Sequence, residues 1–188
     1  MSSETSSSVT MLDDLLPEYA FHSRYTRMIA ADPPTVWASL DEIPRWRLPV
    51  TGLLMGVRTL GSKRLRSGPP MLATVDGVEQ VRGAVAKFWR LKPELAKIPP
   101  GPGAFVSFDE PGWAKAAMSL RLAVTEAGTE VVVETRVQPT SPDAGRRFAP
   151  YWRLIKLGGA GLIRIELLGA LAWTAERRAR TCNKPANA

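Results

Sequence analysis

Residues 113–142 read WAKAAMSLRLAVTEAGTEVVVETRVQPTSP. Two runs within this stretch, 113–125 and 129–138, are rich in aliphatic and β-branched residues. In the second run Val131, Val133, Thr135 and Val137 alternate with Val132, Glu134, Arg136 and Gln138. The dipeptide Ala127-Gly128 between the runs is typical of a tight turn. The stretch therefore predicts a long antiparallel β-hairpin.

A helix is predicted to follow this hairpin directly. Ser141 has the character of an N-cap and Pro142 suits the first helical turn. Helical patterning runs to about Lys156, and the glycines of the segment 158–161 should interrupt the helix there. Leu162, Ile165, Leu168 and Ala172 then predict one apolar face that continues to about Arg178.

Weaker patterns upstream predict the remaining elements. In chain order these are a strand at Tyr19–Ala31, a short helix opened by Asp32 and Pro33, a second helix at Val50–Leu65, and strands at Met71–Val75, Glu79–Arg90 and Ala104–Phe108. Strands that are grouped together and then followed by a helix indicate an α+β fold. We expect one domain over residues 19–180, with flexible tails at 1–18 and 181–188.

The composition excludes several classes of protein and of binding site. A chain of 188 residues fits one domain. A single cysteine, Cys182, rules out a disulfide framework, and with a single histidine, His22, neither a cysteine-cluster nor a multi-histidine metal site is expected. The Ser-rich start does not resemble a signal peptide, and no apolar run has the length of a membrane span. We therefore expect a cytoplasmic protein without metal or cofactor.

The positive charge is concentrated near the end of the chain. The net charge is +7, and residues 146–184 contain nine basic and only two acidic side chains, which accounts for the whole excess. Such a segment suits either a solvated helix face or a weak contact with an anionic membrane surface. No specific binding to nucleic acid is expected.

The order of elements resembles the helix-grip fold of the START, Bet v 1 and polyketide-cyclase-like (SRPBCC) superfamily, in particular an uncharacterised bacterial branch. The segments that carry this resemblance are Arg27–Leu40, Phe108–Lys115, Glu134–Val137, Phe148–Ile155 and Gly161–Arg164. The resemblance implies a curved antiparallel sheet wrapped on a long C-terminal helix, with two short helices after the first strand. It implies an internal cavity but no particular reaction, since this scaffold hosts carriers, sensors and enzymes.

The cavity implied by the resemblance suggests binding of a hydrophobic or amphiphilic small molecule, such as a lipid or a polyketide-like compound, by a carrier or sensor. The expected lining residues are Phe88 or Trp89, Phe105, Trp113, Met118, Leu120, Leu122, Tyr151, Trp152 and Ile155. The alternative interpretation is that these residues form a solid core, because burial of large apolar side chains is stabilising in itself.

A second hypothesis is an enzyme of the cyclase, dehydratase or hydrolase type that uses acid–base residues in the same cavity. The candidates are Glu134, Arg82, Lys115 and His22. For Glu134 the alternative is a cross-strand ion pair with Arg121 on the outer face of the sheet. The enzyme hypothesis requires at least two of the candidates to converge around one substrate.

Overall fold

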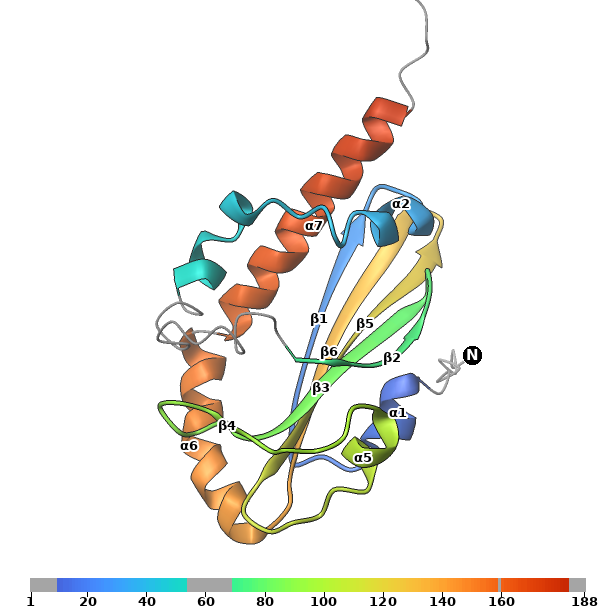
Figure 1. Cartoon of the computed structure of the whole chain (residues 1–188). Helices are drawn as coiled ribbons and strands as arrows, with labels where there is room; N and C mark the ends of the chain where they lie inside the picture. The colour runs from blue at the N-terminus through green and yellow to red at the C-terminus, as the bar shows by residue number, and fades with distance from the viewer. Residues whose placement is uncertain (1–9, 54–68, 159, 183–188) are drawn as a thin grey trace, which may run out of the picture.

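A computed structural model describes residues 10–53, 69–158 and 160–182. Its elements are α1 (Met11–Leu15), β1 (Phe21–Ile29), α2 (Pro33–Ala38), the 3₁₀ turn η1 (Arg45–Arg47), β2 (Met71–Val75), β3 (Glu79–Lys87), β4 (Glu94–Leu95), α5 (Pro102–Val106), β5 (Ala114–Thr125), β6 (Gly128–Pro139), α6 (Pro142–Gly158) and α7 (Ala160–Cys182). Figure 1 shows α6 and α7 following one another along one side of a twisted sheet, with a change of direction between them.

The sheet is antiparallel and has the strand order β1-β6-β5-β3-β2, while the short β4 pairs with β3. Its centre is the predicted hairpin of β5 and β6, which pair from Ala114↔Pro139 to Thr125↔Gly128. Gly128 has a φ of 130°, and a Cβ there would lie 2.3 Å from the carbonyl oxygen of Ile29. The turn therefore requires glycine, both for its backbone angle and for the closeness of β1.

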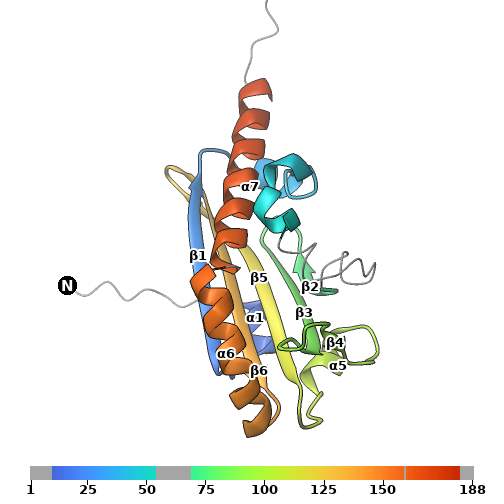
Figure 2. The ribbon, with the colours of Figure 1, turned by 90° about the vertical axis from the view of Figure 1, so that its left-hand side faces the viewer.

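Helices cover both faces of this sheet. The face toward α6 and α7, called the helix face, carries the side chains of Ala116, Met118 and Leu120, and the opposite face, called the outer face, carries those of Ala117 and Ser119. The outer face is covered by α1 and α5, as Figure 2 shows for α1 behind the strands and α6 and α7 in front of them. An antiparallel sheet wrapped on a long C-terminal helical segment is the helix-grip arrangement, so the predicted fold class is confirmed.

The first helix lies inside the stretch 1–18 that was predicted to be a flexible tail. The carboxylate of Asp13 accepts hydrogen bonds from the backbone N–H and the hydroxyl of Thr10, both at 2.8 Å, which stabilises the start of α1. Leu12, Leu15 and Leu16 are buried against Val81 of the outer face. The boundary expected at residue 19 is therefore wrong, because an apolar cluster as short as this one is still buried when it meets an apolar sheet face.

Two other predicted elements need correction. Where a strand was expected, at Ala104–Phe108, the structure has the helix α5. This helix begins with Pro102, after Gly101 at a φ of 119°. The predicted strand is too short for residue alternation to distinguish a strand from a helix. The strand expected to reach Arg90 ends at Lys87. Residues 50–53 of the helix predicted at Val50–Leu65 are helical, and its remainder lies outside the described residues. Among the described helices, none has both the length and the hydropathy required of a membrane span.

Candidate functional site

Two apolar clusters occupy the ends of the helix face. The α7 cluster joins the strands to α2 and α7 and comprises Ile29, Ala31, Val36, Leu120, Leu122, Val131, Val133, Leu168, Leu171, Ala172 and Ala175. The α6 cluster comprises Ala114, Val137 and Phe148, with Phe21, Phe88, Trp89, Ala116, Tyr151 and Trp152 packed around them. Five aromatic rings lie within 6.5 Å of the Phe148 ring, centroid to centroid, so this end is filled by side chains.

Between the clusters runs a row of residues with a different character. Strand register places Ser23, Thr135, Met118 and Arg82 side by side across β1, β6, β5 and β3, and we call these four residues the central row. Polar and flexible side chains here replace the branched aliphatic residues of the α7 cluster. The small residues Ala84 and Ala116, paired on β3 and β5, lie next to the row.

Solvent reaches the helix face at this position. Ala84, Ala116 and Met118 are only half-buried, although β3 and β5, to which they belong, each have a neighbouring strand on both sides. Their neighbours on the outer face, Val85 and Ala117, are buried. At this position the helix face of β3 and β5 is therefore less completely covered than the outer face.

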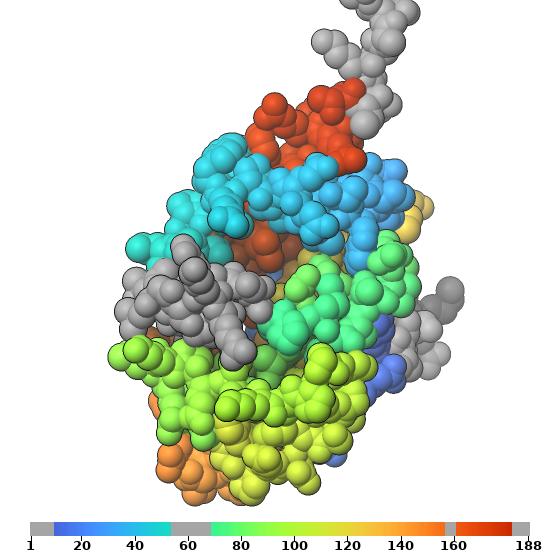
Figure 3. Space-filling model, in the orientation of Figure 1, coloured from blue at the N-terminus to red at the C-terminus, as the bar shows by residue number. Residues whose placement is uncertain are grey.

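The space-filling view agrees with this. Figure 3 shows the surface hollowed between the blue-to-cyan segment that follows β1 and the green strands β2 and β3, with atoms of the C-terminal helix visible in its depth. The blue-to-cyan rim is tied to α7 by Glu166, whose carboxylate accepts hydrogen bonds from the N–H groups of Val50 at 2.8 Å and Thr51 at 2.7 Å. Burial acts to raise the pKa of Glu166, but these hydrogen bonds outweigh it and lower that pKa.

Arg164 of α7 reaches the central row. Its Nη2 donates a hydrogen bond to Thr135 Oγ1 at 2.8 Å. Burial lowers the pKa of Arg164, and the phenols of Tyr25 and Tyr151 are the titratable groups that act in the opposite direction. One turn earlier, a Cβ on Gly161 would lie 3.1 Å from the Tyr25 hydroxyl, so the glycine leaves room for this ring against the helix.

Sequence reasoning did not single out Arg164 as a binding residue. The apolar face predicted for α7 ran through Leu162 and Ile165, but both side chains are more than half exposed. The buried stripe instead contains Leu168, Leu171 and Ala175, and a helix continues that stripe back to position 164. The sequence feature that could have identified Arg164 is an arginine at a core-facing position of an otherwise apolar helical stripe.

The structure distributes the predicted lining residues over the central row, the two apolar clusters, α6 and the outer face. Met118 belongs to the central row, Leu120 and Leu122 to the α7 cluster, and Trp89, Tyr151 and Trp152, with Phe88, to the α6 cluster, while Ile155 on α6 is half-buried. Phe105 and Trp113 lie across the sheet on the outer face, where the Trp113 ring contacts Phe108 and Lys87. Both residues were expected in the cavity on the strength of the family resemblance, and the segment around Phe105 is a helix instead of the predicted strand.

The predicted catalytic residues do not meet at the hollow. His22 and Glu134 lie together, with Nε2 and Oε1 3.2 Å apart, but on the outer face. Lys115 is also on that face and donates to the carbonyl oxygen of Val106 at 2.7 Å, and burial lowers its pKa. Only Arg82 is on the helix face, where Nη1 donates to the carbonyl oxygen of Pro69 at 3.3 Å. The hypothesis that these residues act together in one cavity is therefore wrong.

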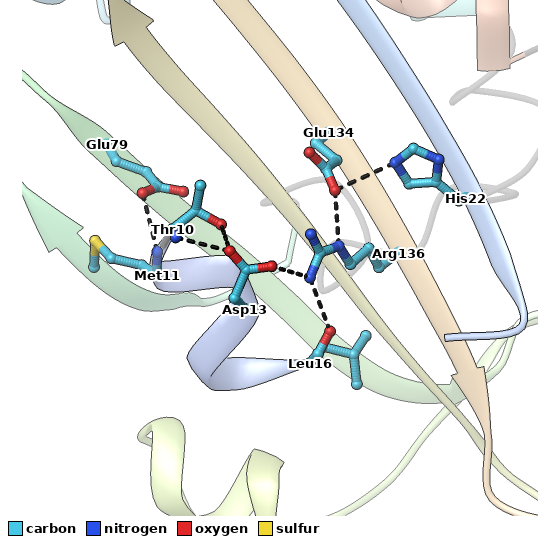
Figure 4. Close-up of polar contacts among 8 residues, drawn as sticks. All are labelled: Thr10, Met11, Asp13, Leu16, His22, Glu79, Glu134 and Arg136. Carbon is cyan, nitrogen blue, oxygen red and sulfur yellow. Dashed lines mark hydrogen bonds and ion pairs between the residues drawn. The ribbon is translucent and has the colours of Figure 1, made fainter. Parts of the chain in front are cut away.

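Figure 4 shows what the outer-face group does instead. Arg136, nearly fully buried, donates from Nε to Glu134 at 2.7 Å and from Nη1 to Asp13 at 2.8 Å and to the carbonyl oxygen of Leu16 at 3.2 Å. Burial acts to lower the pKa of Arg136, but the hydrogen bonds to Asp13 and Glu134 raise it overall. Glu134 thus pairs with His22 and Arg136, and the network fixes the end of α1 to the sheet.

No protein-family model matches the sequence, and no curated protein matches it either. Similar solved structures include a protein of Chromobacterium violaceum, with 13% identity over 82% of this chain and 97% of that one and a TM-score of 0.38. A protein of Mesorhizobium loti has 14% identity over 84% of this chain and 98% of that one, with a TM-score of 0.38. The Zhui aromatase/cyclase from a Streptomyces species has 13% identity over 87% of this chain and 98% of that one, with a TM-score of 0.35. Likeness at this level does not indicate what this chain binds.

Proposed function

We propose that this protein binds a hydrophobic or amphiphilic small molecule, as a carrier or sensor, in the space between the central row and α7. The observation that carries the proposal is the half-burial of Ala84, Ala116 and Met118 on the helix face, opposite residues that are buried on the outer face. Apolar clusters at both ends of this space would hold the apolar part of a ligand, and a few polar groups between them would orient it.

The distribution of acid–base residues favours binding over catalysis. A catalytic cavity needs at least two titratable groups within hydrogen-bond reach of one substrate. His22, Glu134 and Lys115 are separated from the hollow by the sheet itself. The resemblance to the polyketide-cyclase-like superfamily is compatible with a binding protein, because the scaffold alone does not specify a reaction.

Two neighbouring alanines provide a direct test of the space. Methionine at position 116 would project into the hollow, whereas methionine at position 117 would project into the packed outer face, where Ala117 is 1% exposed. We expect Ala116→Met to change the free energy of unfolding by less than about 1 kcal/mol, and Ala117→Met to lower it by about 1–3 kcal/mol or more, because overpacking forces neighbours apart. Urea unfolding of both variants measures the difference.

The same pair tests binding. Decanol is a suitable probe, and calorimetric titration should show that Ala116→Met weakens its binding while folding is retained, because the added side chain occupies the ligand's space. Equal destabilisation by both substitutions would mean that the helix face is packed as tightly as the outer face. The proposed function would then have no basis.

We further propose a weak contact between the C-terminal end of α7 and an anionic membrane, which would suit a carrier of lipid-like molecules. Arg177 and Arg180 are exposed on this end of α7, and Trp46, which is 67% exposed, packs edge-on against Trp173 beside Arg177. Exposed tryptophan next to arginine is typical of surfaces that rest at a membrane interface. Neutralising the two arginines, with vesicle binding as the readout, tests this contact.

A further inference from the structure

We infer that Arg164 is the headgroup-binding residue of the hollow and that the ligand is a single-chain carboxylate, held by its carboxylate on the guanidinium. This inference rests on the proposed function and names the class of molecule. It concerns a residue that the predicted lining did not include.

The position of Arg164 supports this role. The residue lies in line with the buried Leu168 and Leu171 on α7, and its half-buried side chain reaches the sheet at Thr135. The hydrogen bond from Nη2 to Thr135 Oγ1 holds the guanidinium over the central row. Thr135 is paired with Met118 on β5, and Met118 is one of the half-buried residues of the helix face.

The surroundings of Arg164 favour a carboxylate. Burial strengthens the interaction of a guanidinium with an anion, because fewer water molecules compete for it. A carboxylate matches the planar fork of arginine and can accept two parallel hydrogen bonds from it. The phenols of Tyr25 and Tyr151 lie near enough to influence the titration of Arg164, and their hydroxyl groups are suited to donate further hydrogen bonds to a carboxylate.

The two clusters explain why the carboxylate should belong to an amphiphile. The central row is bordered on one side by the α7 cluster, through Leu120, and on the other by the α6 cluster, through Ala116. A head placed on Arg164 therefore leaves the rest of the ligand against apolar side chains. Burial of each methylene contributes about 0.8 kcal/mol, so a short alkyl chain would add substantially to affinity.

The test compares two probes that differ only in the head, decanoate and 1-decanol, by calorimetric titration of the full chain at neutral pH. The wild type should bind decanoate more tightly than decanol by about tenfold or more, because a hydrogen-bonded ion pair replaces a neutral contact. Arg164→Met should weaken decanoate by about tenfold to a hundredfold and leave decanol nearly unchanged. Retained decanol binding also shows that this variant is folded.

Two further variants make the result specific. Arg153→Gln removes one positive charge from an exposed position on α6 and should leave both affinities unchanged. Thr135→Val removes the hydroxyl that positions the guanidinium and should weaken decanoate alone, by a smaller factor than Arg164→Met. If Arg164→Met does not fold, Arg164→Lys keeps the charge but loses the fork, and should reduce the preference for decanoate.

The outcomes separate the two proposals. Failure of the wild type to bind either probe would overturn the proposed function, and the inference with it. Equal binding of decanoate and decanol, or a preference for decanoate that survives in Arg164→Met, would overturn the inference while the hollow remains a binding site.

Discussion

Two carboxylates, those of Asp13 on α1 and Glu79 on β3, stabilise α1, but their pKa values are shifted in opposite directions. The backbone hydrogen bond from Thr10 is the main reason why the pKa of Asp13 is lowered, with Arg136 also contributing. Glu79 accepts a hydrogen bond from the N–H of Met11 at 3.1 Å, but it is almost fully buried, and burial raises its pKa. Asp13 thus stabilises the fold in its ionised form, whereas Glu79 carries a penalty for ionising.

We predict that Glu79→Gln gains stability relative to the wild type as pH rises. The carboxyl ionises near its ordinary pKa of 4.5 in the unfolded chain but at a higher pH in the folded protein. Its contribution to stability is therefore fully present below that ordinary value and decreases as pH rises through the raised value. Glutamine does not ionise, and its carbonyl oxygen can still accept from Met11. Urea unfolding at about pH 4 and about pH 7 measures the change.

The control for this prediction is Glu94→Gln, which alters a more exposed carboxylate paired with Lys87 and Arg90. That variant should lose a small amount of stability at neutral pH, because its ion pairs favour the ionised form. A gap between Glu79→Gln and the wild type that stays constant with pH would show that ionisation of Glu79 costs nothing in the folded state.

Residue patterns in the strands could be predicted from the sequence, but the face that each residue occupies could not. Alternation on β6 correctly separated Thr135 from Glu134 and Arg136. Yet Val131, Val132 and Val133 are all buried, so hydrophobicity did not distinguish the face toward the C-terminal helices from the face toward α1. Both faces of this sheet are covered, which removes the contrast between a wet and a dry side on which such assignments depend.

At the scale of elements, α1 shows that a short segment distant in sequence from β3, on which it packs, is part of the domain. Together with Leu16, which follows it, α1 contributes three buried leucines and two polar contacts, to Glu79 and Arg136. A five-residue helix has little stability by itself, so packing and capping must account for its formation. The sequence showed the apolar cluster but not the surface that would bury it, which explains why the segment was expected to be flexible.

We predict that Leu12→Ala lowers the free energy of unfolding by about 2–5 kcal/mol, since Leu12 is 0% exposed and truncation leaves a cavity. The matched control is Leu91→Ala, the same substitution at a residue that is 86% exposed, and it should change stability by less than about 0.5 kcal/mol. Chemical unfolding of both variants measures the contrast. Indistinguishable stabilities would mean that α1 is not anchored to the sheet in solution.

At the scale of the whole molecule, most of the basic charge, Arg164 excepted, lies away from the hollow. The hollow faces the side of the sheet covered by α7, whereas the basic residues follow the C-terminal helices to their end. Several of these charges are already paired, as Arg147 is with Asp143 and Arg178 with Glu42. Arg177 and Arg180 are exposed, with Arg177 on the same surface as Trp46 and Trp173, and they are the residues on which a membrane contact would depend.

We predict that Arg177→Gln/Arg180→Gln weakens binding to vesicles containing phosphatidylserine by about tenfold or more, because each arginine near an anionic surface contributes about 1 kcal/mol. The matched control, Arg24→Gln/Arg90→Gln, removes the same charge from exposed positions on β1 and after β3, and should bind as the wild type does. Raising the salt concentration should reduce wild-type binding, since it screens the attraction. The two double variants have the same net charge, so only a contact at a defined surface can make their vesicle binding differ. An equal loss of vesicle binding in both would show that net charge alone attracts the protein to the membrane.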